Sequence, residues 1–345
     1  MSKKCLLKTL PKYCINEQSP FFSIVIPLYN NAEYIERCLN SVLNQDFIDY
    51  EIIVVNDGST DGSENVVADL FLEKVKLVNQ YNKGVSVARN KGVTVSSGEW
   101  IAFLDSDDEW SESHLSELYR IINFYTSIDF VSTKSKEVDR CFFNRGKKNQ
   151  QLSNSAGNEY RLINIWRFVI DNPGFIQTSS IAIKRTVFLE VGGFKDVRLG
   201  EDTELYCRVN LKYKCAVSYK ETSYYHRGTM GVMETAESSS EIESISSIFD
   251  VRFAAGYLST LIDELPISQK IDAEYFINGS VYSCYKRHLY KGNFPTLKIL
   301  SKMIIRPKEL KFKLLSRMGA CPLFLLSIFY RSRLLLRNVY LKVKA

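Results

Sequence analysis

The chain has 345 residues, of which 45% are hydrophobic and 24% are charged, a composition typical of a globular protein with a sizeable core. None of its eight cysteines is paired at the spacing of a zinc or redox motif, which disfavours both. The uncharged C-terminal segment Met318–Tyr330 has 13 residues where about 20 are needed to span a bilayer. Because residues 1–22 also lack the apolar core of a secretory signal, we expect a protein of the reducing cytoplasm.

The net charge of +6 is unevenly distributed along the chain. Residues 296–345 hold twelve Lys or Arg and one acidic residue, Glu309, so this tail carries +11 and the first 295 residues carry 6 − 11 = −5. Basic segments mixed with leucine and aromatic residues, as in Leu310–Ala345, can dock on an anionic membrane. The alternative is a solvated helix pair packed on the rest of the protein. No nucleic-acid-binding module is recognisable, so we expect no nucleic-acid partner.

The first hundred residues alternate short apolar runs with helical patterns. This alternation implies right-handed crossovers and a mainly parallel sheet, so the predicted fold class is α/β. Strands are predicted at Phe22–Tyr29, Glu51–Val55, Lys76–Gln80 and Glu99–Leu104, and helices at 35–43, Glu64–Leu72 and Val85–Val95.

The second part of the chain alternates less regularly. Residues 132–160 are polar and poorly periodic, which predicts a loop or an insertion. The remaining predictions are a helix at Arg161–Ile170, a strand at Gln177–Ile183, helices at Arg185–Val191 and Glu201–Val209, and helical structure after about Glu234.

Carboxylates gather at one predicted strand end. In open parallel sheets ligands bind beyond the carboxyl ends of the strands, and Asp105, Asp107 and Asp108 follow the fourth strand. Two carboxylates about 4 Å apart repel by about 4 kcal/mol at an effective dielectric constant near 20. A divalent cation such as Mg²⁺ or Mn²⁺, which shares carboxylates with substrate phosphates, would offset this repulsion. The alternative is a solvated acidic turn that caps the next helix.

Two further motifs limit the possible chemistry. The glycine-rich fingerprints of dinucleotide-binding folds and P-loop NTPases are absent, which disfavours both classes. The acidic segment Gly200–Glu204 opens a predicted helix, where it suits either helix capping or proton transfer. His226 is a lone histidine, and such residues are more often structural than ligands.

Four ordered segments resemble the family 2 inverting glycosyltransferases with the GT-A fold: Ser23–Asn30, Glu51–Gly62, Gly84 followed by Ala88–Asn90, and Phe103–Asp108. The resemblance covers about residues 20–230. It implies a GT-A (Rossmann-like), mainly parallel sheet flanked by helices over residues 21–233. Residues 1–20 then form an N-terminal extension, and residues 234–345 a helical C-terminal region with the basic tail.

The resemblance also implies roles for single residues. Asp202 would be the catalytic base, in a Glu-Asp pair that follows a Gly-Gly-Phe segment, and Glu201 would support it or contact the acceptor. Asp107 would bind the metal, with Asp105 at the metal or the ribose and His226 as a further metal ligand or phosphate contact. The remaining donor-binding residues implied are Pro27, Tyr29, Glu33, Asp57 at the base, Arg89 near the diphosphate, and Ser106.

The function implied by this resemblance is an inverting, Mn²⁺- or Mg²⁺-dependent transfer of a hexosyl or N-acetylhexosaminyl group. The donor would be a nucleotide sugar, UDP-linked, and the acceptor a saccharide or a lipid-linked oligosaccharide of a bacterial surface-polysaccharide pathway. The protein would then lie at the inner face of the cell membrane as a peripheral protein. Two alternatives are a sugar nucleotidyltransferase and a non-catalytic membrane adaptor that retains the fold.

Overall fold

The computed structural model describes residues 19–139, 160–197, 200–227, 253–291, 297, 300–309, 313–314 and 316–317. Its centre is a nine-stranded mixed sheet with the strand order β3-β2-β1-β4-β8-β6-β9-β5, and β7 pairs with β9 beside this path. The strands are β1 (Phe22–Leu28), β2 (Tyr50–Asn56), β3 (Lys76–Asn79), β4 (Trp100–Phe103), β5 (Glu109–Trp110), β6 (Phe130–Asp139), β7 (Tyr160–Ile163), β8 (Ile181–Lys184) and β9 (Cys215–Arg227).

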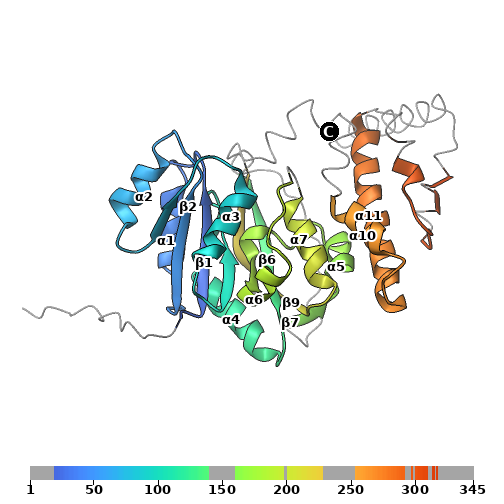
Figure 1. Cartoon of the computed structure of the whole chain (residues 1–345), viewed down its shortest axis with the longest axis horizontal. Coiled ribbons are helices and arrows are strands. Elements are labelled where there is room, and N and C mark those ends of the chain that lie inside the picture. Colours follow the sequence, from blue (N-terminus) through green and yellow to red (C-terminus); the bar gives the residue numbers. More distant parts are fainter. Residues whose placement is uncertain are drawn as a thin grey trace, which may run out of the picture.

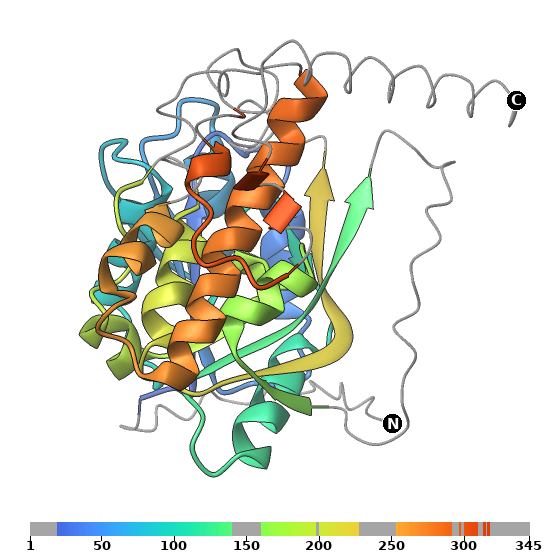
Figure 2. The same ribbon diagram turned by 90° about the vertical axis from the view of Figure 1, so that its right-hand side faces the viewer.

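Most strands of the sheet point in one direction. β1 pairs in parallel with β2 and β4, β2 with β3, and β6 with β9, and β8 lies antiparallel between β4 and β6. β5 and β7 also run antiparallel to β9. The carboxyl ends of β1, β2, β3, β4, β6 and β9 therefore meet at one edge of the sheet, where β8 begins. Figure 2 shows β6 and β9 running side by side towards this edge.

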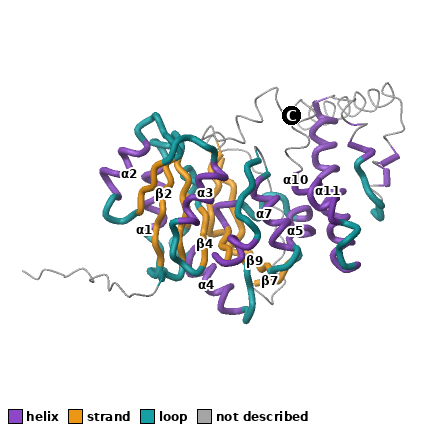
Figure 3. Tube along the Cα trace, viewed as in Figure 1, coloured by secondary structure: helices purple, strands orange, loops and turns teal. Residues whose placement is uncertain are grey.

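Helices cover both faces of the sheet, as Figure 3 shows. One core cluster joins the sheet to α1 (Ile35–Leu43), α2 (Ser63–Phe71) and α4 (His114–Phe124). The opposite face packs against α3 (Val85–Thr94), α5 (Ile165–Asp171), α6 (Arg185–Glu190) and α7 (Glu201–Asn210). Strand β1 is buried along its whole length, as expected for an apolar run covered on both faces.

Helix α3 lies very close to the sheet. A Cβ atom on Gly92 would come within 2.4 Å of a methyl carbon of Val25 in β1, so only glycine permits this approach. The close contact fixes the distance of α3 from the sheet. Because Arg89 belongs to α3, the contact also helps to position Arg89.

Two C-terminal helices extend the molecule beyond the sheet. α10 (Phe253–Leu261) and α11 (Ile267–Lys291) bury apolar side chains against Trp166 of α5 and Cys207 of α7, and Figure 1 shows them beside these two helices. In the described ranges no helix is long and apolar enough to cross a bilayer. Most of the predicted basic tail, Leu310–Ala345, and nearly all of the N-terminal extension lie outside the described residues.

The α/β fold class and the alternation of elements through β4 are confirmed. The loop predicted at 132–160 is wrong for residues 132–139, which belong to β6, and residues 140–159 lie outside the described part. The helix predicted from Arg161 begins only at Ile165, because residues 160–163 pair with β9 and Asn164 caps α5 by accepting from the Arg167 N–H. Strand β9 has no counterpart among the predicted elements.

Candidate active site

The loops that follow β1 and β2 are joined by hydrogen bonds. The backbone N–H of Asn31 donates to the Ser63 hydroxyl at 2.9 Å, and that of Ala32 donates to the Asp61 carboxylate at 2.9 Å. Of the residues predicted to border a nucleotide here, Pro27 is buried in β1, whereas Tyr29 and Glu33 are exposed just beyond it. The loops thus form a fixed rim on which Tyr29 and Glu33 are exposed.

Asp57, at the end of β2, is buried and fully engaged with the next strand end. Its Oδ1 accepts hydrogen bonds from Gln80 Nε2 at 2.7 Å and from the Lys83 N–H at 2.8 Å. Its Oδ2 accepts from the Gly84 N–H at 2.8 Å. These contacts hold the carboxylate in one orientation and bind it to the residue that opens α3.

Arg89 joins two of the predicted motifs. Its Nη2 lies 2.6 Å from Asp105 Oδ1, its Nη1 lies 3.0 Å from Glu201 Oε1, and its side chain is only 3% exposed. Burial by itself lowers the pKa of Arg89, but the two carboxylates outweigh burial and raise it, so the guanidinium stays charged. The guanidinium carbon of Arg89, Cζ, also lies 5.1 Å from the ring centre of Phe194, a cation–π contact. The acidic motif after β4 and the acidic pair of α7 are therefore neighbours.

The turn after β4 buries one of its carboxylates and leaves the other two partly exposed. Asp108 is buried, and its carboxylate accepts from the Ser179 hydroxyl at 2.5 Å and from the His226 N–H at 3.0 Å. Asp105 and Asp107 are both partly exposed. Ser106 is buried and its hydroxyl accepts from Asn31 Nδ2 at 2.6 Å. Asp105 and Asp107 are thus the carboxylates that face outward.

His226 lies at the end of β9 next to this turn. Its Nε2 is 3.1 Å from Glu109 Oε1, and Glu109 Oε2 is 3.6 Å from Arg37 Nε. Arg37 in turn donates to the backbone carbonyl of Asp107. The histidine ring is therefore linked to the acidic turn through Glu109 and Arg37.

The negative charge of the acidic turn raises the pKa values of neighbouring groups. Burial and then the charges of Asp107 and Asp105 raise the pKa of Asp108 well above its usual range. Burial and the charges of Asp108, Asp107 and Asp105 raise the pKa of Tyr225 to about 12 and that of the Cys38 thiol well above its usual value. Within the described ranges no three His, Cys, Asp or Glu side chains are arranged as a complete metal site. Asp105 and Asp107 fit a hard cation that also takes phosphate oxygens, because such ions need only one or two carboxylates from the protein.

The acidic pair of α7 begins directly after Gly200, which has a φ of +83°. Asp202 accepts from the Thr203 N–H at 2.5 Å, and both acidic residues lie in the first helical turn, where the helix dipole favours negative charge. Burial and the charge of Asp202 raise the pKa of Glu201, while Arg89 opposes the shift. The pair thus supplies a partly exposed carboxylate, Asp202, beside one held by Arg89.

The Gly-Gly-Phe segment is anchored to α3 beside Arg89. The Asn90 side chain accepts from the Phe194 N–H at 2.9 Å and donates to the Phe194 carbonyl at 2.8 Å. Gly193 has a φ of +63°, and a Cβ there would lie 2.6 Å from Asn90 Oδ1. Neither Asn90 nor Ser179 is among the predicted site residues. Asn90 is an uncharged residue between Arg89 and Lys91, and no charged residue adjoins Ser179 in the sequence.

The predicted site residues meet at the sheet edge. Arg89 contacts both Asp105 and Glu201, and Asp107 and Asp202 lie within two residues of these carboxylates along the chain. Asp57 is connected to it through Gly84 and α3. Their assignment to substrate, base or metal stays a prediction.

Residues 23–189 match the model of Glycosyl transferase family 2. The uncharacterized glycosyltransferase alr2836 of Nostoc sp. is 28% identical over 265 residues, which cover 72% of this chain and 78% of that protein. Among solved structures, residues 1–349 of S. aureus TarS in complex with UDP-GlcNAc match with a TM-score of 0.64 and 21% identity, over 82% of this chain and 81% of TarS. The mannosyltransferase PcManGT of Pyrobaculum calidifontis, in complex with GDP-Man and Mn²⁺, matches with a TM-score of 0.52 and 16% identity, over 90% and 86% of the two chains.

The sheet order, the flanking helices and the structural matches define a protein with the GT-A fold of glycosyltransferases. The family model identifies the domain more closely: residues 23–189 form a family 2 glycosyltransferase domain. The predicted fold class and the resemblance that suggested it are confirmed.

Proposed function

We propose that this protein transfers a hexosyl or N-acetylhexosaminyl group from a UDP-linked donor to a saccharide or lipid-linked acceptor, with inversion at the anomeric carbon. The observation that carries the proposal is the contact of Arg89 with both Asp105 and Glu201. This contact places the acidic turn, expected at the donor diphosphate, next to the acidic pair of α7, expected at the acceptor. Donor and acceptor must lie this close if the acceptor oxygen is to displace the diphosphate in one step.

Donor binding is assigned to the rim formed by the loops after β1, β2 and β3. Asp57 would contact the base, with Pro27, Tyr29 and Glu33 around the base and ribose, and Ser106 near the ribose. Support comes from the fixed orientation of Asp57, which accepts three hydrogen bonds. The structural neighbours TarS and PcManGT are described with UDP-GlcNAc and GDP-Man, which supports a nucleotide-sugar donor.

The residues of this chain would hold a divalent cation, Mn²⁺ or Mg²⁺, through Asp107 and Asp105. His226 is the further candidate ligand. When bound, the cation would act as a Lewis acid on the leaving diphosphate. The negative field around the acidic turn and the Mn²⁺ in the PcManGT complex support this assignment.

Asp202 is the proposed general base. It would take the proton of the acceptor hydroxyl while that oxygen forms a bond to the anomeric carbon. The bond from this carbon to the diphosphate oxygen breaks, and its electron pair leaves with the nucleoside diphosphate. Glu201, held by Arg89, would contact the acceptor or support Asp202.

The acceptor would be presented at a membrane. We infer from the +11 charge of residues 296–345 that the protein binds the anionic inner face of the cell membrane as a peripheral protein. A lipid-linked acceptor in bacterial surface-polysaccharide synthesis would then lie within reach.

A calorimetric titration with UDP, with and without Mn²⁺, tests the donor and metal assignments together. We expect UDP binding that depends on the metal, followed by metal-dependent hydrolysis or transfer when UDP-sugars are screened. Consumption of a nucleoside triphosphate with release of pyrophosphate would instead support a nucleotidyltransferase. Absence of any nucleotide binding would support the non-catalytic adaptor and reject the proposal.

A further inference from the structure

Ser179 lies at the centre of the sheet edge although no acidic or basic residue adjoins it in the sequence. It belongs to the 3-10 turn Thr178–Ser180, directly before β8. Because β8 runs against β4 and β6, its beginning, not its end, arrives where the parallel strands finish. Ser179 is 1% exposed, so it can act on a ligand only through its neighbours.

The Ser179 hydroxyl holds both ends of the acidic turn. Its oxygen accepts the Asp105 N–H at 3.1 Å, and its proton is donated to Asp108 Oδ2 at 2.5 Å. A hydroxyl has one donor and two acceptor positions, so both bonds form at once. The turn itself is closed by the Asp108 N–H, which donates to the Asp105 carbonyl at 3.0 Å. One side-chain atom thereby fixes the four-residue segment from which Asp105 and Asp107 project.

The backbone of Ser179 is equally constrained. Its carbonyl accepts from the Trp110 indole N–H at 2.6 Å and from the Ser223 hydroxyl at 2.9 Å. Trp110 continues the chain beyond the acidic turn, and Ser223 belongs to β9. Ser179 therefore ties the turn after β4 to β5 and β9, the strands on the far side of β6.

We propose that Ser179 is a positioning residue that sets the direction of the Asp105 and Asp107 carboxylates and so the affinity for the divalent cation. This inference rests on the proposed metal-dependent function. Its physical basis is that groups behind the ligands of a metal orient those ligands, and their removal commonly lowers metal affinity by about 10- to 100-fold.

The test measures UDP binding by calorimetry as a function of Mn²⁺ concentration, with the full chain and the variants Ser179→Ala, Ser179→Thr and Ser180→Ala. Ser180 is the matched control, because it is equally buried but its hydroxyl contacts only Gln177 and Ser132. We expect Ser179→Ala to raise the half-saturating Mn²⁺ concentration about tenfold or more. Ser180→Ala should leave it within about twofold, and Ser179→Thr, which keeps the hydroxyl, should recover most of the loss.

Thermal unfolding without ligands shows whether each variant is folded. If Ser179→Ala does not fold, Ser223→Ala replaces it, because that change loosens the Ser179 carbonyl but keeps the hydroxyl. We then expect a smaller increase in half-saturating Mn²⁺, about threefold, and an unchanged value overturns the inference.

The remaining outcomes separate this inference from the function on which it rests. A wild-type protein that needs Mn²⁺ for UDP binding, with an identical requirement in Ser179→Ala, leaves the function standing and rejects the role of Ser179. An equal effect of Ser180→Ala also rejects it, since the loss would then be a general result of altering this turn. A wild-type protein that binds UDP without any metal overturns both proposals.

Discussion

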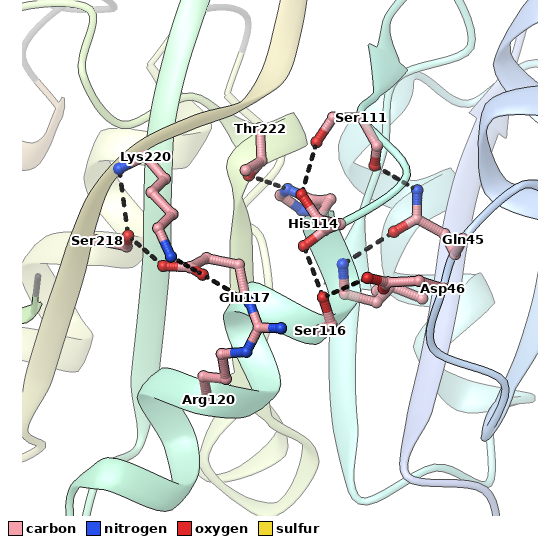
Figure 4. A network of polar contacts seen from close by, with 12 residues as sticks. Gln45, Asp46, Ser111, His114, Ser116, Glu117, Arg120, Ser218, Lys220 and Thr222 are labelled. Carbon is pink, nitrogen blue, oxygen red and sulfur yellow. Dashed lines mark hydrogen bonds and ion pairs between the residues drawn. The ribbon is translucent and has the colours of Figure 1, made fainter.

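Two clusters of charged side chains, the candidate site and a cluster between α4 and β9, differ in what their charges contact. In the site, Arg89 holds Asp105, which is 30% exposed, and Asp107 is also partly exposed. In the cluster between α4 and β9, which we call the α4 network, Glu117 is 1% exposed. Figure 4 shows its members: Gln45, Asp46, Ser111, His114, Ser116, Glu117, Arg120, Ser218, Lys220 and Thr222.

The α4 network satisfies its charges from within the protein. Glu117 accepts from the Ser218 hydroxyl at 2.6 Å and from Lys220 Nζ at 3.0 Å. His114 contacts the Thr222 hydroxyl at 2.8 Å and stacks on Trp110. In the site, by contrast, Asp105 and Asp107 remain partly exposed, and burial together with their charges raises the pKa of Asp108. The comparison indicates that the α4 network supports the fold, and it agrees with the proposal that the site meets a cation and a substrate.

The largest expected effect comes from removing Asp107, the carboxylate proposed to bind the metal. Asp107→Ala should lower metal-dependent turnover about a thousandfold, because a bound cation contributes several kcal/mol to stabilising the leaving charge. The measurement is initial rate against Mn²⁺ concentration, with thermal unfolding as the control for the fold. Turnover at the wild-type level would show that Asp107 is not a metal ligand needed for the reaction.

The next effect separates chemistry from binding. Asp202→Asn should lower kcat about a hundredfold or more, because an amide cannot take the acceptor proton. The affinity for UDP in the presence of Mn²⁺ should stay within about twofold of the wild type, as calorimetry can measure. A parallel loss of UDP binding would contradict the assignment of Asp202 to the acceptor side.

A change in the α4 network should alter stability and leave the site intact. Glu117→Ala leaves the Ser218 hydroxyl and Lys220 without their carboxylate, and we expect a loss of about 1–3 kcal/mol in the free energy of unfolding. Glu112→Ala, at an exposed position just before α4, is the control and should change stability little. Chemical denaturation gives the stability and calorimetry the UDP affinity. A folded Glu117→Ala protein that fails to bind UDP would show that the α4 network also contributes to ligand binding, which contradicts the distinction between the two clusters.

The smallest effect is a difference in pH dependence. Burial lowers the pKa of His114 to about 3, so the folded protein keeps this histidine neutral while the unfolded chain protonates it below about pH 6.5. Its contribution to stability is therefore present above pH 6.5 and is lost as the pH falls towards 3. His114→Gln removes this proton uptake, which amounts to at most about 1.4 kcal/mol per pH unit.

Chemical denaturation of the wild-type and His114→Gln proteins at pH 7, 6 and 5 measures their free energies of unfolding. The difference in their free energies of unfolding should narrow as the pH falls, because only the wild type is destabilised through this residue. A difference that is constant or grows with acidity would show that His114 is protonated in the folded protein.

The first half of the fold was predictable because its signals are local. Apolar runs predicted β1 to β4, and the helical pattern at 35–43 predicted α1, whose Ile35, Cys38 and Val42 are buried. The later strands were missed or misplaced, since β6 buries Ser132, Thr133 and Ser135. These polar side chains suit a strand interior only where distant groups bond them, such as the Ser180 hydroxyl for Ser132.

The sequence by itself determined which acidic segments follow the strands and open α7, because turns and residue types are set over a few neighbouring positions. Only the tertiary structure decided that Arg89 joins Asp105 to Glu201, 112 residues from Arg89 along the chain, and that Asp108 turns inward. It also decided the place of Ser179, because the antiparallel direction of β8 brings the start of a strand to an edge otherwise made of strand ends. Such meetings depend on strand order and direction, which the full set of packed elements fixes and no short stretch of sequence encodes.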